Sequence, residues 1–217
     1  MFERHYLEDS LLQLRKLKGQ ADRAISQIDD KQLFAVLDPE ANSIAVIMKH
    51  IAGNMRSRWT DFLTSDGEKP NRDRDREFVV EPGNSRAAIL AMWEEGWNHA
   101  FHAVASLTPE DLGKTIRIRD EPHSVVEAIN RQMSHYAAHV GQIVLLAKHY
   151  AGANWHSLSI PRGKSREFEV SKRGAAYDLK QDPQKGGPNA RLPSGSRYTE
   201  NAPRQMGISS GLTVELL

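Results

Sequence analysis

Histidine offers the clearest chemistry in this 217-residue chain, which contains nine histidines and no cysteine. Two of them, His135 and His139, stand four residues apart in the run SHYAAHVGQ. On a helix this spacing places both imidazoles on one face, about 6 Å apart, which suits two ligands of one metal ion. The same spacing also occurs on helix surfaces without any ligand, so the pattern alone leaves a metal site and a structural role open.

A third candidate ligand is His50, in the run MKHIAGN. At 100° per residue, His50 lies well away from the centre of its helix's apolar stripe, and His135 and His139 lie on the rim of theirs. Three solvated histidines, or one site at the mouth of a helical bundle, would both give this pattern. His99 and His102, three residues apart in WNHAFHAV, form a competing pair. The other histidines lie at ends or flanks, and we expect no chemical role for them (His5, His123, His149 and His156).

The absence of cysteine limits the chemistry of such a site. It excludes disulfides, thiolate ligands and a sulfur nucleophile carried by the protein. A site made only of imidazoles suits a divalent metal, with zinc or nickel favoured and iron as an alternative. Three neutral imidazoles would leave at least one position of that ion open, which is the feature that distinguishes catalytic from structural sites.

Four segments with helical periodicity must position these histidines. Apolar residues recur at three- and four-residue steps over residues 2–28, 44–62, 85–106 and 124–151, with charged residues between them. The second helix can start at Asn42 or Ser43 and the third at Asn84 or Ser85, since each of these can cap a helix. Long amphipathic helices bury their stripes against one another, which predicts an all-α four-helix bundle.

The connecting segments carry different patterns. Residues 65–82, rich in turn formers and alternating charge, are expected to form a long exposed loop with a short extended piece at 78–80. The run IRIRDEPH predicts a short strand-like connector before the last helix. After residue 165 the periodicity is lost and proline and glycine become frequent. We therefore expect a bundle domain over 1–165 and a long, irregular or disordered C-terminal extension over 166–217.

The composition of the chain argues against two classes of binding partner, nucleic acid and membranes. Lysine and arginine number 29 and aspartate and glutamate 28, so no basic field favours nucleic acid or an anionic membrane. No apolar run reaches the roughly 18 residues of a transmembrane helix, and the first residues lack a signal-peptide pattern. These features predict a cytoplasmic protein that binds neither nucleic acid nor membrane.

A histidine early in the second helix, followed by a late helix with His135, His139, Gly141 and Gln142, resembles the DinB-like superfamily. The resemblance covers residues 1 to about 160. It implies an up-up-down-down four-helix bundle with a divalent metal held by His50, His135 and His139. The superfamily includes bacillithiol- and mycothiol-dependent S-transferases and a mycothiol-dependent maleylpyruvate isomerase.

The resemblance also implies a function, namely metal-dependent transfer of a low-molecular-weight thiol to an electrophilic substrate. Arg162 and Lys164 could pair with carboxylates on such a thiol, or be ordinary solvated charges. No residue is assigned as general base. The alternative is a non-catalytic metal-binding or stress-response bundle. A homodimer is expected from the resemblance and from apolar residues such as Trp93 and Trp97.

Truncation after Ser165 should leave a folded helical domain, because the periodic apolar residues end before this position. The truncated protein should keep the helical circular dichroism and cooperative thermal unfolding of the full chain. Loss of both would show that the extension completes the core.

Overall fold

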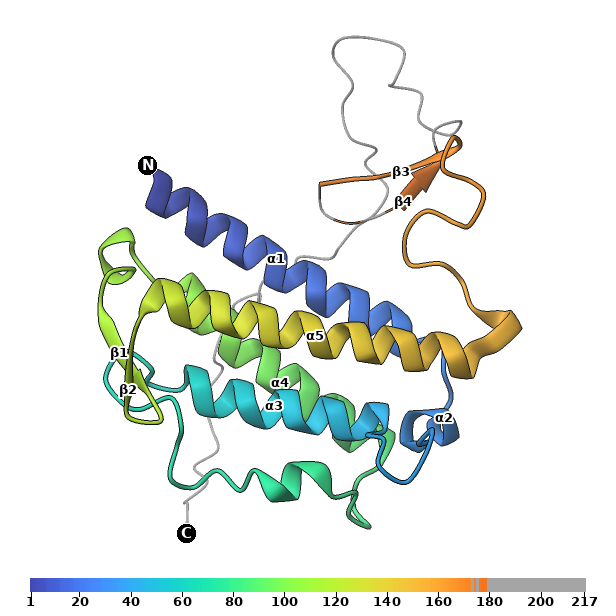
Figure 1. Cartoon of the computed structure of the whole chain (residues 1–217), viewed down its shortest axis with the longest axis horizontal. Coiled ribbons are helices and arrows are strands. Elements are labelled where there is room, and N and C mark those ends of the chain that lie inside the picture. The colour runs from blue at the N-terminus through green and yellow to red at the C-terminus, as the bar shows by residue number, and fades with distance from the viewer. Residues whose placement is uncertain (173, 175, 179–217) are drawn as a thin grey trace, which may run out of the picture.

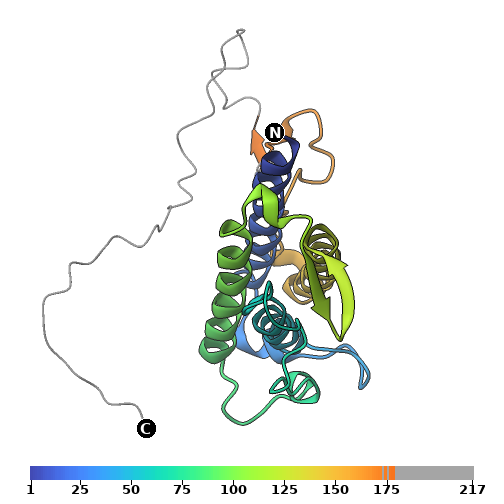
Figure 2. The same cartoon turned by 90° about the vertical axis from the view of Figure 1, so that its left-hand side faces the viewer.

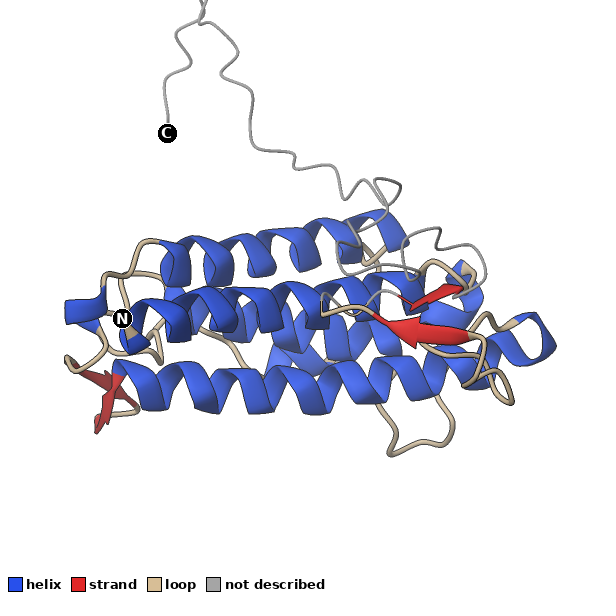
Figure 3. Cartoon of the chain, turned by 90° about the horizontal axis from the view of Figure 1, so that it is seen from above, coloured by secondary structure: helices blue, strands red, loops and turns tan. Residues whose placement is uncertain are grey.

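The computed structural model describes residues 1–172, 174 and 176–178 of the chain, and this part is mostly helical. Four long helices lie side by side (Figures 1 and 3). They are α1 (Phe2–Ile25), α3 (Ile44–Trp59), α4 (Arg86–Ala105) and α5 (Val125–Ala151). A short α2 (Asp30–Phe34) joins α1 to α3, and three 3₁₀ turns lie in the connections: η1 (Asp75–Phe78), η2 (Pro109–Asp111) and η3 (Gly152–Asn154).

Two small antiparallel hairpins complete the described structure. The strand-like connector is confirmed, since β1 (Thr115–Ile118) pairs with β2 (Glu121–Ser124) directly before α5 (Figure 2). The second hairpin, β3 (Phe168–Val170) and β4 (Ala176–Asp178), lies within the expected irregular extension. Residues 173, 175 and 179–217 lie outside the described residues, so the prediction for most of the extension stays a prediction.

Serine side chains fix where the three later long helices begin. Ser43, Ser85 and Ser124 each accept a hydrogen bond from the backbone N–H three residues further on, as N-cap residues do. Of the alternative caps in the sequence, the serine is used each time. Gly152, with a φ of 54°, ends α5 in a conformation that favours glycine.

The core lies between the four long helices and contains the large aromatic side chains. Trp93 and Trp97 are both 0 % exposed, with their rings edge to face. They therefore do not favour a dimer surface, and the homodimer stays a prediction supported only by the family resemblance. The described part of the chain contains no helix that is long and apolar enough to cross a membrane.

Side-chain hydrogen bonds fix the direction of α1, α4 and α5. Tyr6, near the start of α1, donates to Asn130 near the start of α5, so these helices run parallel. Arg86, at the start of α4, donates to the backbone carbonyl of Ile25 at the end of α1, so α4 runs opposite to α1.

Lys49, in the first half of α3, donates to Asn84 directly before α4, so α3 and α4 run parallel to each other. Along the chain the four long helices therefore run up, down, down and up (Figure 1). The expected up-up-down-down order is wrong in this respect. The reason is the length of the connections. The short α2 turns the chain back at the end where α1 stops, whereas residues 60–85 run back beside α3 before α4 begins (Figure 1).

A close approach between α3 and α4 predicts a destabilising substitution. A Cβ atom on Gly96 of α4 would lie 2.7 Å from Cα of Ala52 in α3. Gly96→Ala should therefore lower the free energy of unfolding by about 1–3 kcal/mol, as overpacking does. Gly141→Ala is the matched control, because nothing lies within 4 Å of a Cβ there and alanine is the better helix former. Chemical denaturation of both variants is the measurement, and equal effects would contradict the close approach.

Candidate metal centre

Three histidines from two helices meet where α3 packs against α5. His50 comes from α3, and His135 and His139 lie one turn apart on α5. Nε2 of His135 is 3.3 Å from Nε2 of His50 and 3.1 Å from Nε2 of His139. One ligand nitrogen from each residue lies within 4.8 Å of the other two. The structure thus brings together the three residues that the sequence singled out.

The two distances from His135 fit the ligands of one ion. With metal–nitrogen bonds of about 2.1 Å, two imidazole nitrogens lie about 3.4 Å apart in a tetrahedral site and about 3.0 Å apart in an octahedral site. The two short distances, 3.1 and 3.3 Å, fall between these values. The three residues could therefore hold a metal ion, and imidazole is a good ligand for zinc, nickel and iron.

The second ring nitrogen of two of these histidines has a fixed partner. Nδ1 of His50 is 2.9 Å from a carboxylate oxygen of Glu77, and Nδ1 of His139 is 2.7 Å from the side-chain oxygen of Gln142. Both partners are acceptors, so in each neutral ring the proton belongs on Nδ1. The Nε2 lone pairs of His50 and His139 then point towards His135, as metal ligation requires.

Burial keeps the two histidines on α5 uncharged. Desolvation, followed by the charges of His139 and His50, lowers the pKa of His135 to about 4. Desolvation also lowers the pKa of His139, although its bond to Gln142 opposes the shift. Neutral imidazole is the form that binds a metal, so protons compete little with an ion at neutral pH.

The segment expected to be an exposed loop covers His50 instead. Within residues 65–82, the turn η1 packs on α3, and Glu77 and the Arg72 side chain are almost fully buried. The ring of Phe78 lies 4.9 Å from that of His50. His50 is therefore only 6 % exposed, although helical periodicity placed it off the apolar stripe.

Arg72 holds Glu77 by a bidentate ion pair. Its Nε and Nη2 atoms lie 2.8 Å from Oε1 and Oε2 of the carboxylate. Burial raises the pKa of Glu77, but the hydrogen bonds from His50 and Arg72 together lower it by more than burial raises it. The pKa of Glu77 therefore lies below its ordinary value. The sequence analysis missed both residues, because the run of alternating charges around them gives no indication of which ones turn inward.

The competing histidine pair lies elsewhere. His99 is partly exposed, with its Nε2 atom 3.8 Å from Glu95, and His102 is exposed. Neither belongs to the group of histidines that could hold an ion among the described residues. The expected pairing of Arg162 and Lys164 with a thiol also gains no support, since both are exposed and Lys164 pairs with Glu167.

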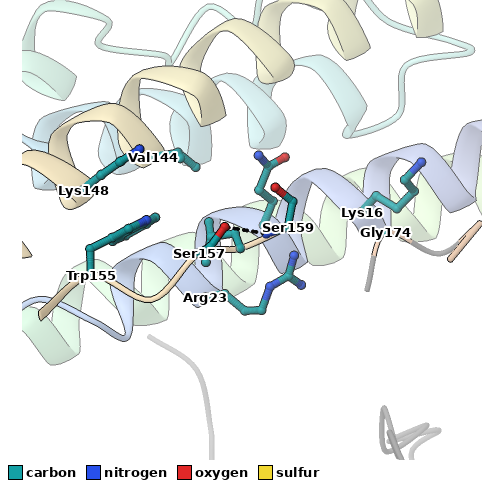
Figure 4. Close-up of a pocket in the computed structure, with 10 residues that line it drawn as sticks. Lys16, Arg23, Val144, Lys148, Trp155, Ser157, Ser159 and Gly174 are labelled. Atoms are coloured by element: carbon teal, nitrogen blue, oxygen red, sulfur yellow. Dashed lines mark hydrogen bonds between the residues drawn. The ribbon is translucent and has the colours of Figure 1, made fainter. Parts of the chain in front are cut away.

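Two cavities stand out in the described structure, and neither is lined by these histidines. One, of about 270 Å³, lies between α1, α5 and the segment after α5, with Lys16, Lys148 and Trp155 in its wall (Figure 4). The other, of about 340 Å³, is open and lined by residues 70–75, including Arg72. The histidine cluster instead faces solvent along α5, where Ala138 and Gly141 are exposed.

The fold and the cluster together define a helical protein with a histidine group that could hold a metal ion. Residues 1–164 match the model of the family described as "Protein of unknown function (DUF1572)", and the chain belongs to that family. The match ends one residue before the domain boundary expected at residue 165. No curated protein matches the chain.

The lowered pKa of His135 predicts how the stability of the metal-free protein depends on pH. Between pH 6.5 and about 4, the unfolded chain binds a proton at this residue and the folded protein does not. The free energy of unfolding should therefore fall as the pH drops through this window, by up to about 3 kcal/mol, because His135 is partly exposed and solvent screens some of the shift. Denaturant unfolding of chelator-treated protein is the measurement, and His135→Gln should flatten the curve. An unchanged slope in that variant would contradict the shift.

Proposed function

We propose that this chain is a DinB-like four-helix bundle that binds one divalent metal ion through Nε2 of His50, His135 and His139. The observation that carries the proposal is the convergence of three imidazole nitrogens, two of which have their other ring nitrogen held by an acceptor. Zinc or nickel suits the all-nitrogen donor set best, and iron is the alternative.

The arrangement has a closed side and an open side. Glu77 and Phe78 close it next to α3, whereas the exposed small residues Ala138 and Gly141 leave room beside His139. A ligand from solvent would therefore approach along α5. A divalent ion held there would lower the pKa of a thiol that it binds and so supply a nucleophile at neutral pH.

We further propose that the activity is transfer of a low-molecular-weight thiol to an electrophile. The chain has no cysteine, so the sulfur must come from the solvent. In the transfer a sulfur–carbon bond forms, the bond to the leaving group breaks, and the thiol proton goes to solvent. Glu77 is an unsuitable base for that proton, because Arg72 and His50 already occupy its carboxylate.

A second candidate function is metal binding without catalysis. The positions of the two cavities favour it, because neither cavity borders the histidines. Neither could therefore enclose a substrate beside them. A cytoplasmic location, where small thiols stay reduced, and a homodimer remain predictions under either function.

Metal content tests the site itself. Protein purified without a histidine tag should carry about one divalent ion per chain, and replacing His50, His135 and His139 by alanine should remove it. Elemental analysis by mass spectrometry is the measurement, with circular dichroism to show that the variant is folded. His99→Ala with His102→Ala is the matched control and should keep the metal. Full metal content in the triple variant would refute the site.

The reaction is tested separately. Metal-loaded protein should accelerate conjugation of bacillithiol, mycothiol or glutathione to monochlorobimane, with release of chloride, and chelation should abolish the acceleration. The appearance of the fluorescent conjugate is the readout. Rates equal to those of metal-stripped protein with all three thiols would favour the non-catalytic function.

A further inference from the structure

We propose that Glu77 is the positioning residue of this centre: it holds the His50 imidazole in the tautomer and orientation that ligation needs. An ion pair with Arg72 fixes the Glu77 carboxylate, and the absence of a side chain at Gly53 leaves space for it. The inference rests on the proposed metal site and assigns it a part that the three histidines do not supply. It concerns a residue from the loop between α3 and α4, remote in sequence from all of the ligands.

Hydrogen bonds from His50 and Arg72 hold the carboxylate of Glu77 in one orientation. Oε2 lies 2.9 Å from Nδ1 of His50 and 2.8 Å from Nη2 of Arg72, and Oε1 lies 2.8 Å from Nε of Arg72. Glu77 is 8 % exposed, and the Arg72 side chain is 4 % exposed. The guanidinium fork fixes the carboxylate plane, and that plane fixes the direction of the acceptor that faces His50.

The clamp is tied to the rest of the fold at its other end. Nη1 of Arg72 lies 3.2 Å from Glu68, whose second carboxylate oxygen lies 2.9 Å from the buried Arg58 of α3 and 3.0 Å from Arg119. Asp66 accepts hydrogen bonds from the backbone N–H groups of the turn between β1 and β2. The loop is thus held to α3 and to the hairpin, so the position of Glu77 is set by rigid elements.

Gly53 lets the carboxylate approach α3. It lies three residues after His50, on the same face of the helix. A Cβ atom there would lie 2.3 Å from Oε1 and 2.7 Å from Cδ of Glu77, closer than any real Cβ contact. Any side chain at this position would therefore displace the carboxylate from His50.

Acceptors that orient a metal-binding histidine generally raise metal affinity, and their loss typically costs 10- to 100-fold. Glu77→Gln should weaken zinc binding by this factor, because the amide carries no charge and places a donor against Arg72. Glu81→Gln is the matched control. Glu81 lies on the same loop and pairs with an arginine, Arg76, but it does not contact His50. Zinc affinity of the control should stay within about twofold of the unsubstituted protein.

Gly53→Ala separates positioning from folding, because alanine favours the helix while its methyl group excludes Glu77. This variant should keep its helical circular dichroism and lose at least about tenfold in zinc affinity. Gly113→Ala, at an open position before β1 with nothing within 4 Å of a Cβ atom, should lose none.

The protonated nitrogen of His50, measured by ¹⁵N NMR in the metal-free protein, gives a readout that does not depend on metal. The ring should be protonated on Nδ1 in the unsubstituted protein and become a mixture in Glu77→Gln and Gly53→Ala. Unchanged zinc affinity and an unchanged tautomer in both variants would overturn the inference. If the unsubstituted protein binds no divalent ion, the proposed function fails, and the tautomer measurement still decides the role of Glu77.

Discussion

The buried contact between the Glu77 carboxylate and the His50 imidazole is the interaction on which the arrangement of the site depends. A carboxylate removed from water is costly unless its oxygens are satisfied, and here Arg72 and His50 satisfy them. Buried ion pairs contribute little net stability, since desolvation offsets most of their attraction. Their effect is specificity, because breaking one leaves an uncompensated charge. The loop therefore has one low-energy position over α3, and His50 has one orientation.

This constraint explains why most of α3 is buried although its sequence is amphipathic. The helix packs against α4 on one side, through the approach of Gly96 to Ala52, and against α5 on another. The remaining side, which carries Gly53 and the Nδ1 edge of His50, would face solvent in a bundle with short connections. Here η1 covers it. The polar groups that helical periodicity assigns to solvent are satisfied by a second layer of protein.

The sequence was sufficient for the helices, and the reasons are local. The spacing of His135 and His139 indicated a pair of candidate ligands, whereas His50 joined them through the family resemblance. Serine caps, three- and four-residue apolar steps and the spacing of His135 and His139 all act within a few residues. Arg72 and Glu77 could not be found in this way, because they are two of many charges in one run, and burial selects them only once α3 is in place. The helix directions depend on how far residues 60–85 travel, and composition does not encode that distance. Gly53, a helix-weakening residue one turn after His50, was the one local sign that something approaches this face.

The two sides of the histidine cluster differ in how easily a ligand from solvent can reach them, and this difference limits which ligands the site can bind. On the side of α3, Glu77 binds Nδ1 of His50 and the ring of Phe78 packs against its imidazole, so protein covers this side. On the side of α5, Nδ1 of His139 bonds to Gln142, one turn further along its own exposed helix face. An incoming ligand would meet small exposed residues such as Ala138 and Gly141, and neither of the two cavities borders the histidines. Such a site selects its ligand by the bond it makes to an ion more than by shape, which fits a small thiol better than a large substrate.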